Sequence, residues 1–311
     1  MTLVLTITLN PTIDVFGEAG KVEATHKTRL TDARYEPGGG GINVARVISV
    51  LGGDVLACFL SGGEMGAFLS RLLADETIPH RAIAMAGQTR VAFMVHDQST
   101  GLEYRFLPEG PVVTAGDIET CAKVLQGSGG HFLVASGSLP RGAPPDSYAR
   151  LAQAAAAQGM KFVLDSSGEG LRSAVAAGGI YLAKPSRSEL EHLAGRKLDE
   201  AGAETAARDL VASGRVEIVA LTLGAEGAMM VSGGGTLRLP AIPVPVRSAV
   251  GAGDSFLGAM VWALSGNWPL EEAFRLGMAA GAAAIMNTGT VLCRRSDVMD
   301  LYLKTGGTQP L

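Results

Sequence analysis

The sequence has 311 residues, of which 47% are apolar, so it can bury the core of a large globular domain without disulfide or metal cross-links. Its 26 basic and 30 acidic residues are interspersed and give a net charge of −4, which argues against a nucleic-acid partner and an acidic tail. Three scattered cysteines, no signal-peptide features and no apolar run of ~18 residues predict a soluble cytoplasmic protein without a membrane partner.

Short β-branched runs alternate with helical patterns along the chain. Strands are expected at 3–9, 55–60, 91–96, 132–136, 162–165, 181–183 and 218–223, and helices at 65–73, 148–158, 205–212, 256–264 and 274–286. Several of the strand runs are apolar throughout, which is typical of parallel strands buried on both faces. This order predicts an α/β fold with a doubly wound, mostly parallel sheet and helices on both faces. Ligands of such folds bind at the carboxyl ends of the strands.

Two polar stretches interrupt the alternation. Residues 15–35 lack a helical stripe, and residues 90–106 are typical of two strands around a turn at 97–101. Neither stretch suits the core of a doubly wound sheet. We therefore expect one domain over residues 1–311, with a small β-rich lid formed by about 15–35 and 90–106.

Several common fingerprints are missing from the sequence. It has no G-x-x-x-x-G-K-[ST] motif, and no G-x-G-x-x-G follows the first expected strand. HExxH, CxxC and GxSxG motifs are also absent. These absences argue against a dinucleotide-dependent oxidoreductase, a zinc hydrolase, a thiol redox enzyme and a serine hydrolase.

The strongest local signal is the motif VGAGDSFLG at 250–258. Gly251, Ala252 and Gly253 precede an apolar helical run, and Asp254 lies at its start. Backbone N–H groups at a helix N-terminus can bind an anion. A carboxylate beside a transferring phosphoryl group can act as a base. The alternative is that Asp254 is only the N-cap of the helix.

A second glycine-rich motif, EPGGGGINVAR, occupies 36–46. Four glycines precede a helix with Asn43 in its first turn, so a ligand could lie against a bare backbone while Asn43 contacts sugar hydroxyls. The alternative is a flexible turn closed by an N-cap. Asp14 follows a strand expected to end at Asn10 and Pro11, and it either faces the same crevice or caps a loop.

Two later segments suit a nucleotide site. KPSRSE at 184–189 follows an expected strand and opens a helix, and TLGAEG at 222–227 ends another strand in a glycine turn. Each segment could equally be a turn with solvated charges.

Taken together in this order, the motifs resemble those of the ribokinase-like (PfkB-type) carbohydrate kinases. The matching elements are NPTID at 10–14, GGGGINVAR at 38–46, SGSLP at 136–140, DSSGE at 165–169, KPSRSE at 184–189, TLGAEG at 222–227 and VGAGDS at 250–255. Within the family the chain is most similar to the minor bacterial 6-phosphofructokinases, because 1-phosphofructokinases usually have AGKGIN where this chain has GGGGIN. Tagatose-6-phosphate kinase, 1-phosphofructokinase and a non-catalytic sugar-phosphate sensor remain alternatives.

The resemblance implies an ATP- and magnesium-dependent kinase that phosphorylates the 1-hydroxyl of fructose 6-phosphate. It implies that Asp254 is the base, and that the amides of Gly251, Ala252 and Gly253 hold the γ-phosphoryl group. The implied sugar-phosphate ligands are Asp14, Gly38, Gly39, Asn43, Lys27, Arg29, Arg90 and Ser138. The implied ATP ligands are Lys184, Ser186, Thr222, Gly224, Gly227 and Asn287, with Glu189 positioning magnesium through water. Ser248, Val250 and Asn287 lie where related kinases hold a monovalent cation such as potassium, and the family tends to form homodimers through its lid sheets.

Two positions depart from the family pattern. Ser186 stands where the family usually has an asparagine on the metal side of the site. Its hydroxyl can still bond a metal-bound water, although it is shorter than an amide. Ser188 stands where the nearest relatives have a lysine associated with inhibitory ATP binding, so the resemblance does not carry ATP inhibition over to this chain.

Overall fold

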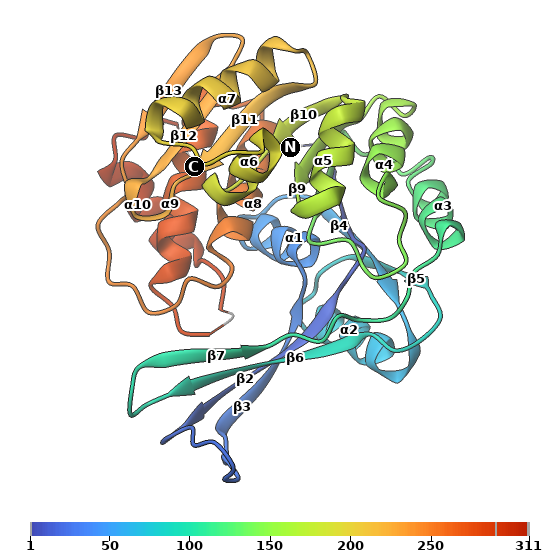
Figure 1. Cartoon of the computed structure of the whole chain (residues 1–311), viewed down its shortest axis with the longest axis vertical. Helices are drawn as coiled ribbons and strands as arrows, with labels where there is room; N and C mark the ends of the chain where they lie inside the picture. The colour runs from blue at the N-terminus through green and yellow to red at the C-terminus, as the bar shows by residue number, and fades with distance from the viewer. Residues whose placement is uncertain (1, 290, 310–311) are drawn as a thin grey trace.

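The computed structural model describes residues 2–289 and 291–309, and a nine-stranded sheet forms its centre (Figure 1). The strand order is β13-β12-β11-β10-β9-β8-β1-β4-β5. The strands are β1 (Val4–Thr8), β4 (Val55–Ser61), β5 (His80–Ala84), β8 (Phe132–Ser136), β9 (Lys161–Asp165), β10 (Ile180–Ala183), β11 (Val216–Thr222), β12 (Ala228–Ser232) and β13 (Gly235–Leu239). All pair in parallel except β11–β12 and β12–β13, which are antiparallel.

Helices cover both faces of this sheet. They are α1 (Gly40–Val50), α2 (Gly63–Asp75), α3 (Ala115–Val124), α4 (Ser147–Ala156), α5 (Gly168–Ala177), α6 (Arg187–Ala194), α7 (Glu200–Ala212), α8 (Ala252–Ser265), α9 (Leu270–Ile285) and α10 (Arg295–Lys304), with a 3₁₀ turn η1 at Gly224–Glu226. Neighbouring strand residues belong to two different apolar cores, as Leu133 and Val134 of β8 do. The predicted doubly wound α/β fold is therefore confirmed. Within the described residues, no helix is both long and apolar enough to cross a bilayer.

A second, four-stranded sheet projects from one edge of the helical layers (Figure 1). Its order is β3-β2-β6-β7, and its strands are β2 (Thr12–Ala19), β3 (Thr31–Gly38), β6 (Arg90–Asp97) and β7 (Leu102–Phe106). Its strands include residues 15–19 and 31–35 of the first polar stretch and residues 90–97 and 102–106 of the second. The expected position of Asp14 at the end of the first strand is wrong. β1 ends at Thr8, and Asp14 is the third residue of β2.

The chain crosses between the two sheets at two places before residue 40 and at two more around residues 85–89 and 107–114. We call these four crossings the hinge. β1 is followed directly by β2 of the second sheet, so the carboxyl end of β1 lies at the hinge. Because β8, β9 and β10 run parallel to β1, polar residues that follow these strands lie on the hinge side of the central sheet.

Candidate active site

The N-terminus of α8 is built around Gly251. This residue caps the helix in the left-handed region (φ 70°), and a Cβ there would lie 2.6 Å from Leu292 Cδ2, so only glycine fits. The N–H groups of the first turn have no acceptor within the helix. Asp254 is the third residue of α8, so the alternative that it is the N-cap is wrong.

The side chain of Asp254 is held by a residue far away in sequence. Asn43 Nδ2, from the first turn of α1, donates a hydrogen bond to Asp254 Oδ2 at 2.9 Å. Burial and, to a smaller extent, the Asp165 carboxylate together raise the pKa of Asp254 to about 6, although the hydrogen bond from Asn43 opposes the rise. At neutral pH the group is mostly ionised, and its pKa lies close to the range that suits a general base.

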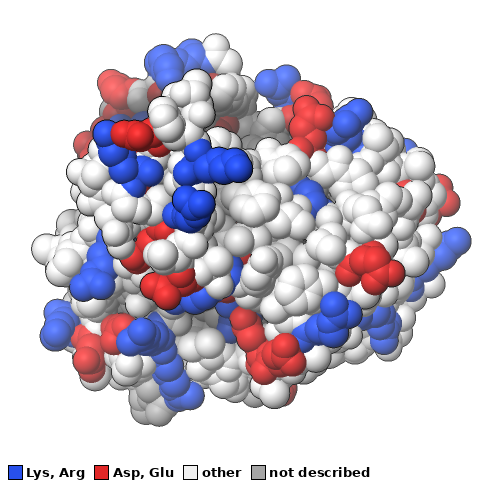
Figure 2. All heavy atoms as spheres, turned by 90° about the horizontal axis from the view of Figure 1, so that it is seen from below, with Lys and Arg blue, Asp and Glu red and all other residues white. Residues whose placement is uncertain are grey.

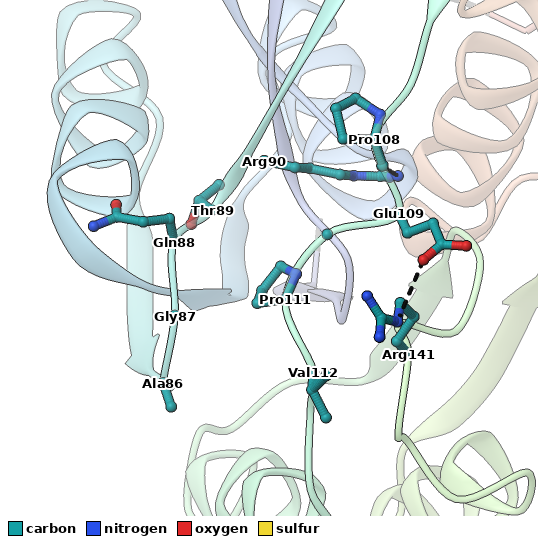
Figure 3. Close-up of a pocket in the computed structure, with 11 residues that line it drawn as sticks. Ala86, Gly87, Gln88, Thr89, Arg90, Pro108, Glu109, Pro111, Val112 and Arg141 are labelled. Carbon is teal, nitrogen blue, oxygen red and sulfur yellow. Dashed lines mark hydrogen bonds and ion pairs between the residues drawn. The ribbon is translucent and has the colours of Figure 1, made fainter.

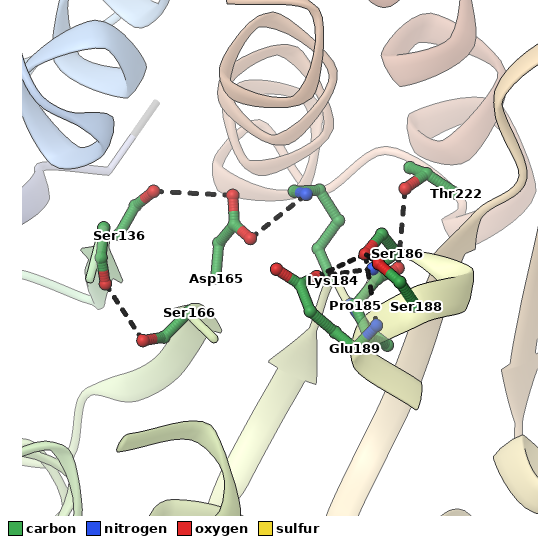
Figure 4. A network of polar contacts seen from close by, with 10 residues as sticks. Ser136, Asp165, Ser166, Lys184, Pro185, Ser186, Ser188, Glu189 and Thr222 are labelled. Atoms are coloured by element: carbon green, nitrogen blue, oxygen red, sulfur yellow. Dashed lines mark hydrogen bonds and ion pairs between the residues drawn. The ribbon is translucent and has the colours of Figure 1, made fainter. Parts of the chain in front are cut away.

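A buried ion pair lies beside Asp254. Lys184 Nζ, which follows β10, is 3.1 Å from Asp165 Oδ1 at the end of β9 (Figure 4). Burial alone would lower the pKa of Lys184, but the Asp165 carboxylate outweighs it and raises the pKa above its usual value. The lysine therefore stays charged. A Cβ on Gly253 would lie 3.3 Å from Lys184 Nζ, so this cation reaches the N-terminus of α8.

A cavity of about 270 Å³ opens at this point. It is lined by Gly40, Ser136, Gly137, Ser138, Asp165, Ser166, Ser167, Glu189 and Asp254. The structure thus brings the predicted residues Ser138, Glu189 and Asp254 to one place. It adds Ser136, Asp165, Ser166 and Ser167, which the sequence interpretation used only as family markers. Polar residues directly after a buried strand were the signal that could have identified them.

Close packing against neighbouring side chains explains the glycines of the EPGGGGINVAR motif. A Cβ on Gly38 would lie 2.2 Å from Asp14 Oδ2, and one on Gly40 would lie 2.2 Å from Ser136 Oγ. Gly39 has a φ of 108° and caps α1. The N-cap of α1 is therefore Gly39 itself, and no side chain caps the helix. These contacts place Asp14 directly against the start of the loop.

Asp14 and Arg90 lie on the same side of the second sheet. Asp14 is buried, and burial raises its pKa to about 6, although a hydrogen bond with Thr12 and the Arg90 charge oppose the rise. Arg90 Nη2 donates to Asn10 O at 3.0 Å, and Arg90 Nη1 donates to Pro108 O at 2.9 Å. The arginine therefore joins two crossings of the hinge.

The structure does not bring Lys27 and Arg29 to this cavity. Both are exposed in the connection between β2 and β3, which Figure 1 shows at the free end of the second sheet. Neither is among the described residues that line the cavity.

The predicted nucleotide residues meet at the start of α6. Ser186 Oγ accepts a hydrogen bond from the Glu189 amide at 3.3 Å, and Glu189 Oε2 accepts from the Ser186 amide at 2.7 Å (Figure 4). This reciprocal pair is a capping box. Thr222 N donates to Pro185 O at 3.0 Å, which places the end of β11 beside Ser186. Gly224 and Gly227 follow in the η1 turn and have φ values of 60° and 96°.

The loop before α8 is joined to the end of α9, because Arg247 N donates a hydrogen bond to Ile285 O at 2.8 Å. Val250 N donates to Ser248 Oγ at 3.3 Å, and Ser248 Oγ donates to Glu103 Oε2 of β7 at 3.1 Å. Asn287 Nδ2 donates to Leu292 O at 3.1 Å. The three residues predicted near a monovalent cation therefore lie in two adjoining loops.

Comparison with known proteins confirms the resemblance inferred from the motifs. Residues 3–297 match the model of the pfkB family carbohydrate kinases. ATP-dependent 6-phosphofructokinase isozyme 2 of Escherichia coli is 40% identical over 304 residues, covering 97% of this chain and 98% of the relative. The Mycobacterium tuberculosis enzyme of that name is 40% identical over 298 residues, covering 95% and 87%. The crystal structure of E. coli phosphofructokinase-2 with potassium superposes with a TM-score of 0.93 at 39% identity, covering 98% and 99%.

More distant relatives act on other phosphosugars. A 1-phosphofructokinase of Haloferax volcanii is 33% identical, covering 96% of this chain and 95% of the relative. A D-tagatose-1-phosphate kinase of Bacillus licheniformis is 30% identical, covering 92% and 94%. The similarity is therefore greater to the 6-phosphofructokinases than to these two enzymes.

Proposed function

The chain belongs to the pfkB family of carbohydrate kinases, and we propose that it is an ATP-dependent 6-phosphofructokinase. The proposed reaction transfers the γ-phosphoryl group of ATP to the 1-hydroxyl of fructose 6-phosphate, which yields fructose 1,6-bisphosphate and ADP. The observation that carries the proposal is the Asp254 carboxylate, held by Asn43 at the free N-terminus of α8 and lining a polar cavity. A positioned carboxylate beside unpaired helix N–H groups suits phosphoryl transfer to an alcohol.

In this mechanism Asp254 accepts the proton of the 1-hydroxyl while the new phosphorus–oxygen bond forms. The bond between the γ-phosphorus and the bridging oxygen of ATP breaks, and ADP leaves. Phosphoryl transfer asks mainly for positioning and for stabilisation of charge on the phosphoryl oxygens. That stabilisation comes from the amides of Gly251, Ala252 and Gly253 and from the Lys184 cation.

In this proposal the sugar phosphate lies between the EPGGGGINVAR motif and the second sheet. Asp14, Gly38, Gly39 and Asn43 hold its hydroxyl groups, while Arg90 and Ser138 bind its 6-phosphate. The contacts of two side chains, the buried Asp14 and the half-buried Asn43, support this placement. Asp14 lies against the Gly38 backbone, and Asn43 already reaches Asp254, so a hydroxyl bound by Asn43 would lie next to the base.

ATP then lies along Lys184, Ser186, Thr222, Gly224 and Gly227, with Asn287 near its far end. Magnesium, when bound, would offset the charge of the transferring phosphates, and Glu189 would hold it through water. The described residues contain no group of three or more histidine, cysteine or acidic side chains that could bind a metal directly. Glu189 lines the cavity together with Asp254, and its carboxylate suits magnesium, which takes oxygen ligands and keeps several waters. A potassium ion near Ser248, Val250 and Asn287 is supported by the E. coli structure that holds potassium.

We also place a homodimer interface on the second sheet, which serves as the lid. Successive strand residues face opposite sides, and the side opposite Asp14 and Arg90 carries Tyr35, Phe93 and Phe106, each between 44% and 57% exposed. Figure 2 views the molecule from this end and shows acidic and basic side chains interspersed, without one large basic patch. A second copy docked there could receive Lys27 and Arg29 at its own phosphate site.

The experiment is a panel of acceptors measured by coupled ADP release with purified protein. Fructose 6-phosphate should give the highest kcat/KM, ahead of tagatose 6-phosphate, fructose 1-phosphate and unphosphorylated fructose. A preference for fructose 1-phosphate would assign 1-phosphofructokinase activity. A preference for tagatose 6-phosphate would assign tagatose-6-phosphate kinase activity. Tight binding without turnover would instead establish the sensor.

A cytoplasmic location is proposed because all three cysteines are buried and unbridged.

A further inference from the structure

A second cavity, of about 660 Å³, lies at the hinge, and Arg90 is its one lining residue that has a role in the mechanism above (Figure 3). It is lined by Ala86, Gly87, Gln88, Thr89, Arg90, Pro108, Glu109, Gly110, Pro111, Val112 and Arg141. Its walls are closely packed. A Cβ on Gly87 would lie 2.9 Å from Pro111 Cβ, and one on Gly142 would lie 2.6 Å from Val112 Cγ1. We call this space the hinge cavity; its size is within the range of small-molecule sites.

The hinge cavity has an excess of positive charge. Its ionisable lining residues are two arginines, Arg90 and Arg141, and one acid, Glu109. Arg90 is tied to two backbone carbonyls and so forms part of the wall. Within the described part of the chain, the Arg141 side chain bonds only to Glu109, with Arg141 Nε 3.3 Å from Glu109 Oε2, and both side chains are mostly exposed (59% and 75%). Such an exposed pair contributes little and is readily exchanged.

The loop that follows β8 connects this cavity to the active site. Ser138 of the loop lines the smaller cavity together with Asp254, and Arg141, three residues later, lines the hinge cavity. The loop is held at both ends. Gly137 O accepts from Tyr148 Oη at 2.7 Å, and Arg141 O accepts from Val113 N at 2.8 Å. A phosphate in contact with Ser138 and Arg90 would therefore lie within the part of the hinge that Arg141 also borders.

We infer that Arg141 binds the phosphate of the acceptor sugar phosphate, and that Glu109 occupies Arg141 until this phosphate displaces it. The inference rests on the proposed function, because it assumes a phosphorylated acceptor. A phosphate monoester carries about two negative charges, so it competes well against a single exposed carboxylate for a guanidinium group. An unphosphorylated sugar gains nothing from displacing Glu109. The pair thus adds to selectivity for phosphorylated acceptors.

A double-mutant cycle with Arg141→Ala and Glu109→Gln tests the exchange. Arg141→Ala should raise the KM for fructose 6-phosphate on the order of tenfold and leave the KM for ATP within about twofold. Glu109→Gln should lower the KM for fructose 6-phosphate about two- to threefold, because the competitor is removed. In the Arg141→Ala background, Glu109→Gln should have no effect. Arg208→Ala, which breaks an ion pair on α7 whose arginine is 55% exposed, is the matched control and should change neither KM.

Three outcomes would overturn the inference. These are an unchanged KM for fructose 6-phosphate in Arg141→Ala, a parallel rise in both KM values, or additive effects of the two substitutions. The proposed function is judged separately, by whether the wild type prefers fructose 6-phosphate to free fructose. If that preference holds while Arg141→Ala is normal, only the role of Arg141 fails.

Discussion

Replacing Asp254 by asparagine should improve stability and abolish most of the activity. Burial and the Asp165 carboxylate raise the pKa of Asp254 from 3.8 to about 6, so folding disfavours its charged form. A rise of that size corresponds to about 3 kcal/mol. Asparagine has the same shape and no charge, and its carbonyl oxygen can still accept the hydrogen bond from Asn43. We expect Asp254→Asn to be up to about 3 kcal/mol more stable at neutral pH.

The pH dependence of this gain follows from the two pKa values. Below about pH 4 the carboxyl group is protonated in both the folded and the unfolded chain, so the wild type carries no penalty. The penalty grows between about pH 4 and pH 6 and is fully present above pH 6. Denaturant unfolding of wild type and Asp254→Asn without ligands, from pH 4 to pH 8, should therefore show a difference that rises and then levels off.

The same substitution tests catalysis. Asparagine cannot accept the hydroxyl proton, so kcat should fall by ~10²–10⁴, the usual effect of losing a positioned base, while both KM values stay nearly unchanged. In the wild type, kcat should fall as the pH drops below about 6 and Asp254 becomes protonated. The remaining activity of the variant should not show that acid limb.

Two results would refute this reasoning. A variant that keeps more than roughly a tenth of the wild-type kcat removes Asp254 from the role of base. A variant no more stable than wild type at pH 7 contradicts the electrostatic argument. Asp209→Asn, at an exposed position on α7, serves as the control and should leave both stability and kcat unchanged.

Four further substitutions test other parts of the site. Glu189→Gln should weaken the apparent magnesium affinity, whereas Ser186→Asn should preserve or improve it; identical magnesium titrations for Glu189→Gln and wild type would end that assignment. Arg90→Ala should raise the KM for fructose 6-phosphate roughly 10- to 150-fold with little change for ATP, and a normal KM would contradict its role. Gly41→Ala should destabilise the fold by about 1–3 kcal/mol in a denaturant titration, because its Cβ would lie 2.7 Å from Ile7 O; an unchanged midpoint would show that the loop can move.

Local patterns in the sequence determined the central sheet and the motifs. The apolar run at 132–136 predicted a strand buried on both faces. β8 has those bounds, and every one of its residues is buried. The glycines at 251 and 253 predicted a helix N-terminus beside a carboxylate, and α8 begins at Ala252. Strands with little local signal were missed. β5 at the sheet edge is mostly exposed, and no continuous apolar run marks it.

Tertiary structure alone decided how the site is assembled. Asn43 and Asp254 are 211 positions apart in sequence, and no local pattern could show that their side chains meet. The raised pKa values of Asp14 and Asp254 depend on desolvation, which exists only once the second sheet and α8 enclose these groups. The hinge positions of Arg90 and Arg141 likewise depend on which crossings pack together. Periodicity and turn chemistry act over a few residues, whereas burial and charge pairing act across the whole fold, so the sequence predicted the elements and the folded chain determined their chemistry.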